Sequence, residues 1–216
     1  MLFLTLVLGL LAADTAGLKI PDAPAATAQA RSTNKATATP ASSENDPIEK
    51  EYEKILEQDE KALNEINRLI RESDAFAKQG APTPAGVLAA KIDAQLDPIR
   101  KIYEDFLKKH PEHVDARLAY GSFLNEVGDT QEAITQWEKA RELAPKNPSP
   151  WNNLANIYGH IGPVKKAFEY YEKAIELDPK EPVYFQNFAT TVYLFRKDAM
   201  EMYRINEEQV FNKSLD

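Results

Sequence analysis

The nine residues EKARELAPK, residues 138–146, return 34 positions later as EKAIELDPK, residues 172–180, with seven letters unchanged. Each copy closes a stretch of helical apolar spacing with a proline, a residue that is unfavourable inside a helix. A helix end written twice at a fixed distance indicates that the chain repeats one structural unit. From Asp46 onward the apolar spacing is helical, and no alternating strand pattern occurs. The predicted fold class is therefore all-α.

Two consecutive units of 34 residues, 114–147 and 148–181, align without a gap. The second unit carries a set of aromatic, small and turn residues at fixed spacing: Trp151, Leu154, Ala155, Tyr158, Ala167, Tyr171, Ala174 and Pro179. This set resembles the tetratricopeptide repeat (TPR) family. The resemblance implies a right-handed superhelical stack of antiparallel helix pairs, since one pair cannot bury its apolar face alone. The first unit departs from the pattern at Arg117, where an aromatic residue is usual.

Small residues and glycines predict the local geometry of each unit. Gly121 and Ala155 occupy matching positions and are expected where two antiparallel helices approach most closely. Gly128 and Gly162 also match and are expected to take the left-handed turn that ends the first helix of each pair.

Residues 46–113 are expected to hold a long helix followed by a degenerate helical unit. Apolar residues keep a three- and four-residue spacing over 47–78, which predicts one long amphipathic helix. This helix is expected to precede the TPR-like helix pairs. This helix either caps the first repeat or dimerises as a coiled coil. Residues 82–112 are either a degenerate unit or one kinked helix, and Asp97-Pro98 is typical of an N-cap followed by a first-turn proline.

Residues 182–216 are predicted to form a modified terminal unit with capping helices. Phe185 and Phe188 continue the apolar spacing of a first helix, but Arg196 stands at the place of the turn glycine. Asn206 with Gln209 is typical of a capping box that opens a short last helix.

The first 45 residues differ in composition from the rest. Residues 1–20 contain an uncharged run from Leu2 to Ala13, which is too short for a comfortable membrane span of about 20 residues and has the length of a signal-peptide core. An uncleaved anchor and a plain apolar N-terminus are the alternatives. Residues 21–45 are rich in Ala, Pro, Thr and Ser and are predicted to be a disordered linker. An exported protein, periplasmic, secreted or membrane-tethered, is the expectation.

Charge and catalytic motifs exclude several classes of function. The formal net charge is −8, which disfavours binding to nucleic acid and to anionic lipid, so membrane association is expected only through an N-terminal anchor. The chain has no cysteine and no phosphate-binding, nucleophile-elbow or zinc-protease motif. His110 and His113 flank a proline at a helix end, which keeps them off one helical face. No enzyme activity, no metal and no cofactor are predicted.

A binding face is the remaining candidate site. The family resemblance implies that first helices line a concave surface, and the 34-residue period arranges their outward positions in columns. The predicted partner-binding residues are Leu118, Ser122, Asn125, Asn152, Asn156, His160, Gln186, Thr190 and Tyr193. Amide side chains can donate to and accept from a peptide backbone. The columns contain no Lys or Arg, so the carboxylate clamp of some family members is not expected. The alternative is a solvated face that binds nothing.

The resulting functional hypothesis is a non-catalytic scaffold that binds a peptide or helix of a partner protein on this face. The alternatives are a structural homo-oligomer assembled through residues 47–78 and an accessory subunit of an envelope complex.

Overall fold

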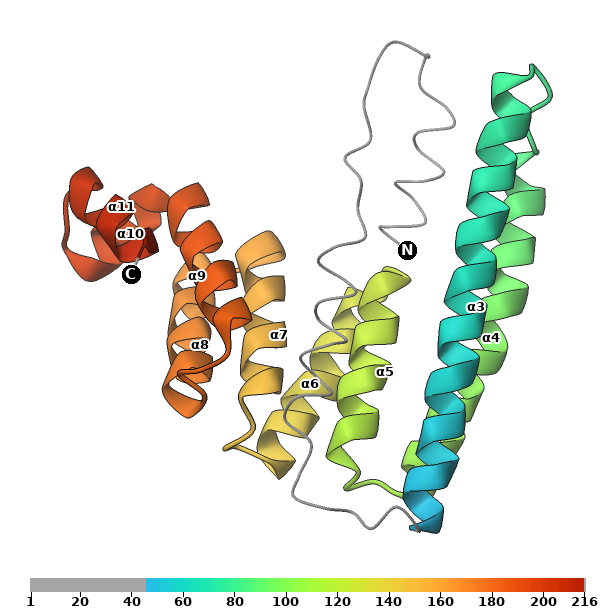
Figure 1. Ribbon diagram of the computed structural model, residues 1–216, viewed down its shortest axis with the longest axis horizontal. Helices are drawn as coiled ribbons and strands as arrows, with labels where there is room; N and C mark the ends of the chain where they lie inside the picture. Colours follow the sequence, from blue (N-terminus) through green and yellow to red (C-terminus); the bar gives the residue numbers. More distant parts are fainter. Residues whose placement is uncertain (1–45, 216) are drawn as a thin grey trace. The chain divides into compact units, whose positions relative to one another are not determined.

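The computed structural model describes residues 46–215, and all regular secondary structure in this range is helical (Figure 1). The helices are α3 (Pro47–Lys78), α4 (Ala85–Lys109), α5 (Val114–Glu126), α6 (Thr130–Leu143), α7 (Pro148–Ile161), α8 (Val164–Leu177), α9 (Pro182–Leu194), α10 (Arg196–Tyr203) and α11 (Glu207–Leu215). They fall into two compact units, one with α3 to α5 and one with α6 to α11. The all-α prediction is confirmed. The predicted export signal (1–20) and linker (21–45) lie outside the described residues.

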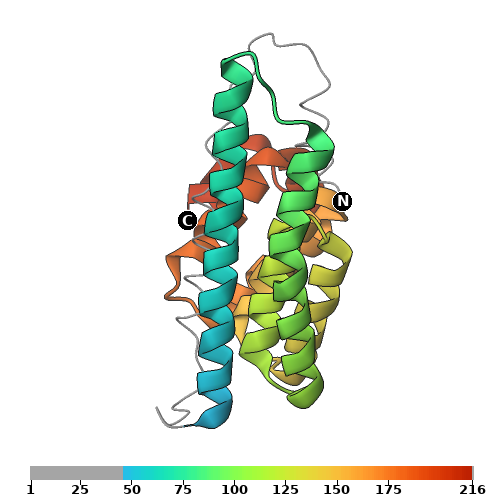
Figure 2. The ribbon, with the colours of Figure 1, turned by 90° about the vertical axis from the view of Figure 1, so that its right-hand side faces the viewer.

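The long helix α3 has the bounds that the sequence predicts and packs against α4 as an antiparallel hairpin (Figures 1 and 2). Asp46 caps its start by accepting the N–H of Ile48 at 2.9 Å, and Pro47 supplies the first-turn proline. Ile55 and Ile66 are buried on the face that pairs within the chain. Oligomerisation through residues 47–78 stays a prediction. No helix in residues 46–215 is both long and apolar enough to cross a bilayer.

Of the two alternatives for residues 82–112, the structure has the single helix α4, and it corrects the N-cap prediction at Asp97-Pro98. Pro98 lies inside one 25-residue helix instead of opening a new one. An internal proline removes one backbone hydrogen bond and costs about 3 kcal/mol. The buried residues of α4 recur every three or four positions on both sides of the proline: Leu88, Ile92, Leu96, Ile99, Tyr103, Phe106 and Leu107. Because this face is continuous, its packing holds the helix together through the exposed proline.

A buried carboxylate joins the two helices of the hairpin. The hydroxyl of Tyr103 donates to Asp59 Oδ2 at 2.8 Å, and both side chains are almost fully buried. Tyr103 also stacks on Tyr120 of α5, with ring centroids 5.0 Å apart. This hydrogen bond favours the observed register of α3 against α4, because sliding either helix by one residue would break a buried hydrogen bond.

Arg117, which departs from the family pattern, makes the same hydrogen bond as Trp151, the residue at the matching position of the second repeat. In the second repeat, Trp151 Nε1 donates to the carbonyl of Pro145 at 3.1 Å. In the first repeat, Arg117 Nε and Nη2 donate to the carbonyl of Pro111 at 2.9 and 2.6 Å. Both donors therefore tie the turn before a first helix to that helix.

The pair α7 and α8 shows the close packing that small residues permit. Ala155 on α7 and Ala167 on α8 have no exposed surface and belong to one apolar core with Tyr171 and Phe188. Gly128 has φ +90°, as predicted. Gly162 does not, since its φ of −135° is extended. Pro163 follows it, and a residue before proline is restricted to extended conformations.

The terminal unit ends in two short helices. Ala199 on α10 and Val210 on α11 complete the core of the second compact unit. The predicted capping box is confirmed: Asn206 N donates to Gln209 Oε1 and Gln209 N donates to Asn206 Oδ1, both at 2.9 Å.

Removing the buried Tyr103–Asp59 hydrogen bond should lower the stability of the fold. Tyr103→Phe should lower the free energy of unfolding by about 1–3 kcal/mol, the range for removing one partner of a buried hydrogen bond. Urea unfolding measures the change. Tyr193→Phe, the same substitution at a side chain that is 52% exposed, should change it by less than about 0.5 kcal/mol. Equal effects of the two substitutions would contradict the assignment.

Candidate protein-binding site

The predicted binding face is partly buried. Leu118, Ser122 and Asn152 are 0%, 5% and 1% exposed, so a partner cannot touch them, and their assignment to an open face is corrected. The reason is the position of the first helices. Helix α7, which carries Asn152, contacts α6, α8 and α9, and helix α5, which carries Leu118 and Ser122, contacts α3 and α4. Each helix is therefore covered on more sides than the predicted core stripe requires.

The buried and half-buried amides of this face bond within the chain. Asn152 Oδ1 accepts from Asn187 Nδ2 at 3.1 Å, and Asn156 Oδ1 accepts from the hydroxyl of Tyr171 at 2.5 Å. Thr191 Oγ1 lies 3.4 Å from the same hydroxyl and donates to the Asn187 carbonyl at 2.9 Å. These groups satisfy one another and leave little for a peptide backbone.

The rest of the predicted face is more accessible. Asn125 is half-buried, and His160, Gln186, Thr190 and Tyr193 are exposed. These residues can contact a partner directly.

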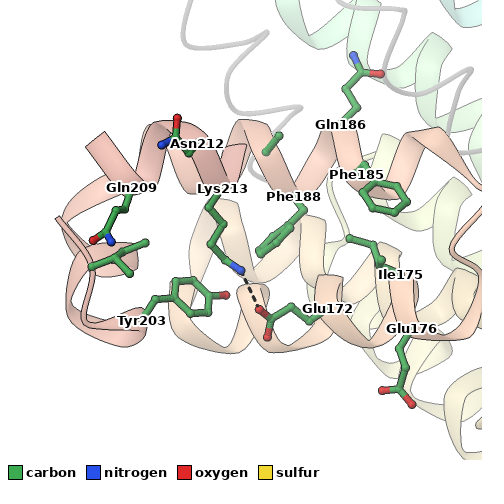
Figure 3. A pocket seen from close by; sticks show the side chains of 12 residues that line it. Glu172, Ile175, Glu176, Phe185, Gln186, Phe188, Tyr203, Gln209, Asn212 and Lys213 are labelled. Atoms are coloured by element: carbon green, nitrogen blue, oxygen red, sulfur yellow. Dashed lines mark ion pairs between the residues drawn. The ribbon is translucent and has the colours of Figure 1, made fainter. Parts of the chain in front are cut away.

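An open groove of about 880 Å³ lies elsewhere in the second compact unit, between α8, α9 and α11 (Figure 3). Its surface is largely apolar. The lining residues are Glu172, Ile175, Glu176, Phe185, Gln186, Phe188, Ala189, Tyr203, Ile205, Gln209, Asn212 and Lys213. Gln186 is the one predicted site residue among them. The exposed amides of Gln186, Gln209 and Asn212 form a polar rim.

Lys213 reaches across the groove from α11. Its Nζ lies 3.5 Å from Glu172 Oε1, 4.2 Å from the ring centroid of Tyr203 and 5.3 Å from that of Phe188 (Figure 3). Lys213 and Glu172 are 32% and 42% exposed. At such exposure an ion pair contributes about 0–1 kcal/mol and a cation–π contact about 0.5–1 kcal/mol. The lysine is therefore held weakly.

The hydroxyl of Tyr203 is buried at the same place. Burial raises the pKa of Tyr203, and the nearby Glu172 carboxylate raises it further. The hydroxyl makes no hydrogen bond of standard geometry within the described residues, but Glu172 lies close enough to interact with it as an acceptor.

The sequence signals for this groove are indirect. Phe185 and Ala189 appear as ordinary members of an apolar stripe, whereas the structure leaves them half-buried in the groove. The missing turn glycine at Arg196 is the one available hint, because it shows that the terminal unit departs from the repeat.

The two histidines of the His110-Pro111-Glu112-His113 segment serve local structure. His113 Nδ1 accepts the N–H of Ala116 at 3.1 Å and so caps α5. Its Nε2 lies 3.3 Å from Glu49 Oε1, and His110 Nε2 lies 3.9 Å from Glu51 Oε2. Across residues 46–215 no three His, Asp or Glu side chains gather in an arrangement suited to a metal ion.

The buried hydroxyl of Tyr171 leads us to predict that the folded protein loses stability at alkaline pH. Desolvation raises the pKa of Tyr171 to about 12, although its hydrogen bond with Thr191 opposes the rise. In the unfolded chain the group ionises near its ordinary value of about 10. The folded state favours the neutral hydroxyl, so the contribution of Tyr171 to the free energy of unfolding is fully present below about pH 10. It is lost as the pH rises towards 12.

Urea unfolding between about pH 9 and pH 11.5 tests this effect. Tyr171→Phe should reduce the loss of unfolding free energy by up to about 1.4 kcal/mol per pH unit, the value for one proton. An unchanged slope would show that Tyr171 ionises as easily in the folded chain as in the unfolded one.

Comparisons with known proteins agree with this architecture. The family model "Tetratricopeptide repeat" matches residues 148–181, and the model "TPR repeat" matches residues 121–162. No curated protein matches the chain.

Three solved structures of MamA are similar, each at 19% identity. MamA 41-end from Desulfovibrio magneticus RS-1 has a TM-score of 0.46, covering 89% of this chain and 94% of that one. A MamA RS-1 ArsTM double mutant has a TM-score of 0.45 with 69% and 92% covered, and a crystal structure of MamA has 0.32 with 59% and 91% covered. The family-model matches show that residues 121–181 of the chain contain tetratricopeptide repeats.

Proposed function

We propose that this protein is a non-catalytic scaffold that binds an apolar segment of a partner protein in the groove between α8, α9 and α11. The observation that carries the proposal is the groove itself, which is open, largely apolar and about 880 Å³ in volume. Small-molecule binding sites have volumes of about 300–1,000 Å³ and apolar walls with a few polar groups, and the groove resembles them in size and lining.

The polar rim favours a polypeptide as the occupant. The amides of Gln186, Gln209 and Asn212 stand at the edge of the groove. Each amide can both donate a hydrogen bond and accept one, as a peptide backbone requires. Apolar side chains such as Ile175 and Phe185 would meanwhile cover the apolar side chains of the bound segment.

The repeat family supports the same reading at a coarser level, since TPR modules are protein-interaction scaffolds and generally non-catalytic. The exposed part of the sequence-predicted face, including Thr190 and Tyr193, can extend the contact surface, and Gln186 belongs to both that face and the groove.

Site-specific photo-crosslinking tests the groove. Benzoylphenylalanine in place of Gln186 should give a light-dependent adduct with a partner protein in cells that make this protein. The same group in place of Glu208, which is exposed on α11 but does not line the groove, should not.

Ala189→Arg places a charged side chain inside the groove and supplies the second control. It should reduce the Gln186 adduct by at least about tenfold, equivalent to 1.4 kcal/mol, with an unchanged circular dichroism spectrum. Equal adduct yields from both positions, or an adduct that Ala189→Arg leaves intact, would remove the groove as the binding site.

We also propose that the protein works outside the cytoplasm. The support is the apolar run from Leu2 to Ala13 followed by the Ala/Pro/Thr/Ser-rich residues 21–45. Mass spectrometry of the protein from its native cells should find it in an exported fraction with residues 2–13 removed, or retained in a membrane fraction. A cytoplasmic protein that still begins at Met1 would contradict export.

A further inference from the structure

The groove contains a binding site for a positive charge, the cation seat, and the side chain of Lys213 from the same chain occupies it. Three elements supply its walls: Glu172 from α8, Phe188 from α9 and Tyr203 from α10. The ammonium of Lys213 from α11 lies between them, 3.5 Å from the carboxylate and 4.2 and 5.3 Å from the two ring centroids (Figure 3).

The chemistry of the seat selects a cation. The faces of aromatic rings carry negative potential and attract ammonium and guanidinium groups. Glu172 adds a full negative charge on a third side. A neutral side chain in the seat would leave this carboxylate without its cation, and an acidic side chain would be repelled.

The present occupant is exchangeable. Lys213 is about one-third exposed, and its 3.5 Å separation from Glu172 exceeds hydrogen-bonding distance. It belongs to α11, a helix of nine residues whose side chains at Gln209 and Asn212 are exposed. A partly exposed lysine can move into solvent while the backbone of its helix stays in place.

We propose that the groove recognises a lysine or arginine side chain of the partner segment, which takes the seat of Lys213 while neighbouring apolar side chains enter the groove. This inference rests on the proposed function, since it specifies the chemistry of the segment bound there. The charge of the surroundings supports it. A second carboxylate, Glu176, lines the same groove, and the chain carries a net charge of −8.

An acidic partner is the opposite possibility, because Lys213 is itself a cation in the groove. The geometry disfavours it. Lys213 faces Glu172, so a partner carboxylate approaching the lysine would also approach this negative charge and the faces of two aromatic rings.

Helical peptides with a single variable residue test the proposal on the full chain. The peptides share leucines three and four residues on either side of one central position, which is lysine, arginine, norleucine or glutamate. Fluorescence anisotropy measures the affinity of each for the wild-type protein and for the variants Lys213→Met and Glu172→Gln. Lys165→Met is the matched control, because Lys165 forms an exposed ion pair with Glu201 outside the groove.

The lysine and arginine peptides should bind at least about tenfold more tightly than the norleucine peptide, a difference of 1.4 kcal/mol, and the glutamate peptide should bind weakest. Lys213→Met removes the competing cation and should tighten lysine-peptide binding by at least about threefold. Glu172→Gln should reduce the lysine preference to less than about threefold, and Lys165→Met should leave it unchanged. Circular dichroism verifies that each variant remains folded.

Equal affinity for the lysine and norleucine peptides, preference for glutamate, or no binding of any peptide would overturn the cation seat. These results are distinguishable from failure of the proposed function. If the Gln186 crosslink forms and depends on the groove, a failed peptide series removes the basic specificity alone. If that crosslink also fails, the groove is not a binding site.

Discussion

A helix pair leaves apolar surface on its outer sides, and covering this surface with further helices is the constraint on which the rest of the structure depends. Small residues allow the covering helices to pack closely. Ala155 and Ala167 are fully buried in one core, where a larger side chain would push their helices apart. The same coverage explains the buried polar residues. Because α7 has neighbours in α6, α8 and α9, Asn152 is buried although its position lies off the predicted core stripe.

Buried polar groups then need partners from neighbouring elements, since an unpaired buried group is costly. Asp59 accepts a hydrogen bond from Tyr103 across the α3–α4 hairpin, and Asn152 accepts one from Asn187 across α7 and α9. Arg117 and Trp151 show that the partner matters more than the residue type, because both donate to a proline carbonyl six residues earlier. A family pattern written in residue types alone records Arg117 as a departure. The hydrogen bond shows it to be an equivalent.

The terminal unit is where this coverage is incomplete. Short helices α10 and α11 follow α9 in place of one long second helix, and they complete the core through Ala199 and Val210. Between α8, α9 and α11 the walls do not meet, which leaves the groove. The weakly held Lys213 bridges it. The surface that we propose for partner binding therefore arises from the same irregularity that ends the repeat pattern.

The sequence by itself determined several features that depend on a few neighbouring residues: the bounds of α3, the turn at Gly128 and the reciprocal cap of Asn206 with Gln209. Their physical causes are backbone hydrogen bonds and side chains within one helical turn. Only the tertiary structure decided that α4 continues through Pro98, that Leu118 and Asn152 are buried, and that Glu172, Phe188, Tyr203 and Lys213 surround one groove. These features depend on which helices become neighbours in space, and a single helix's spacing of residues carries no record of that.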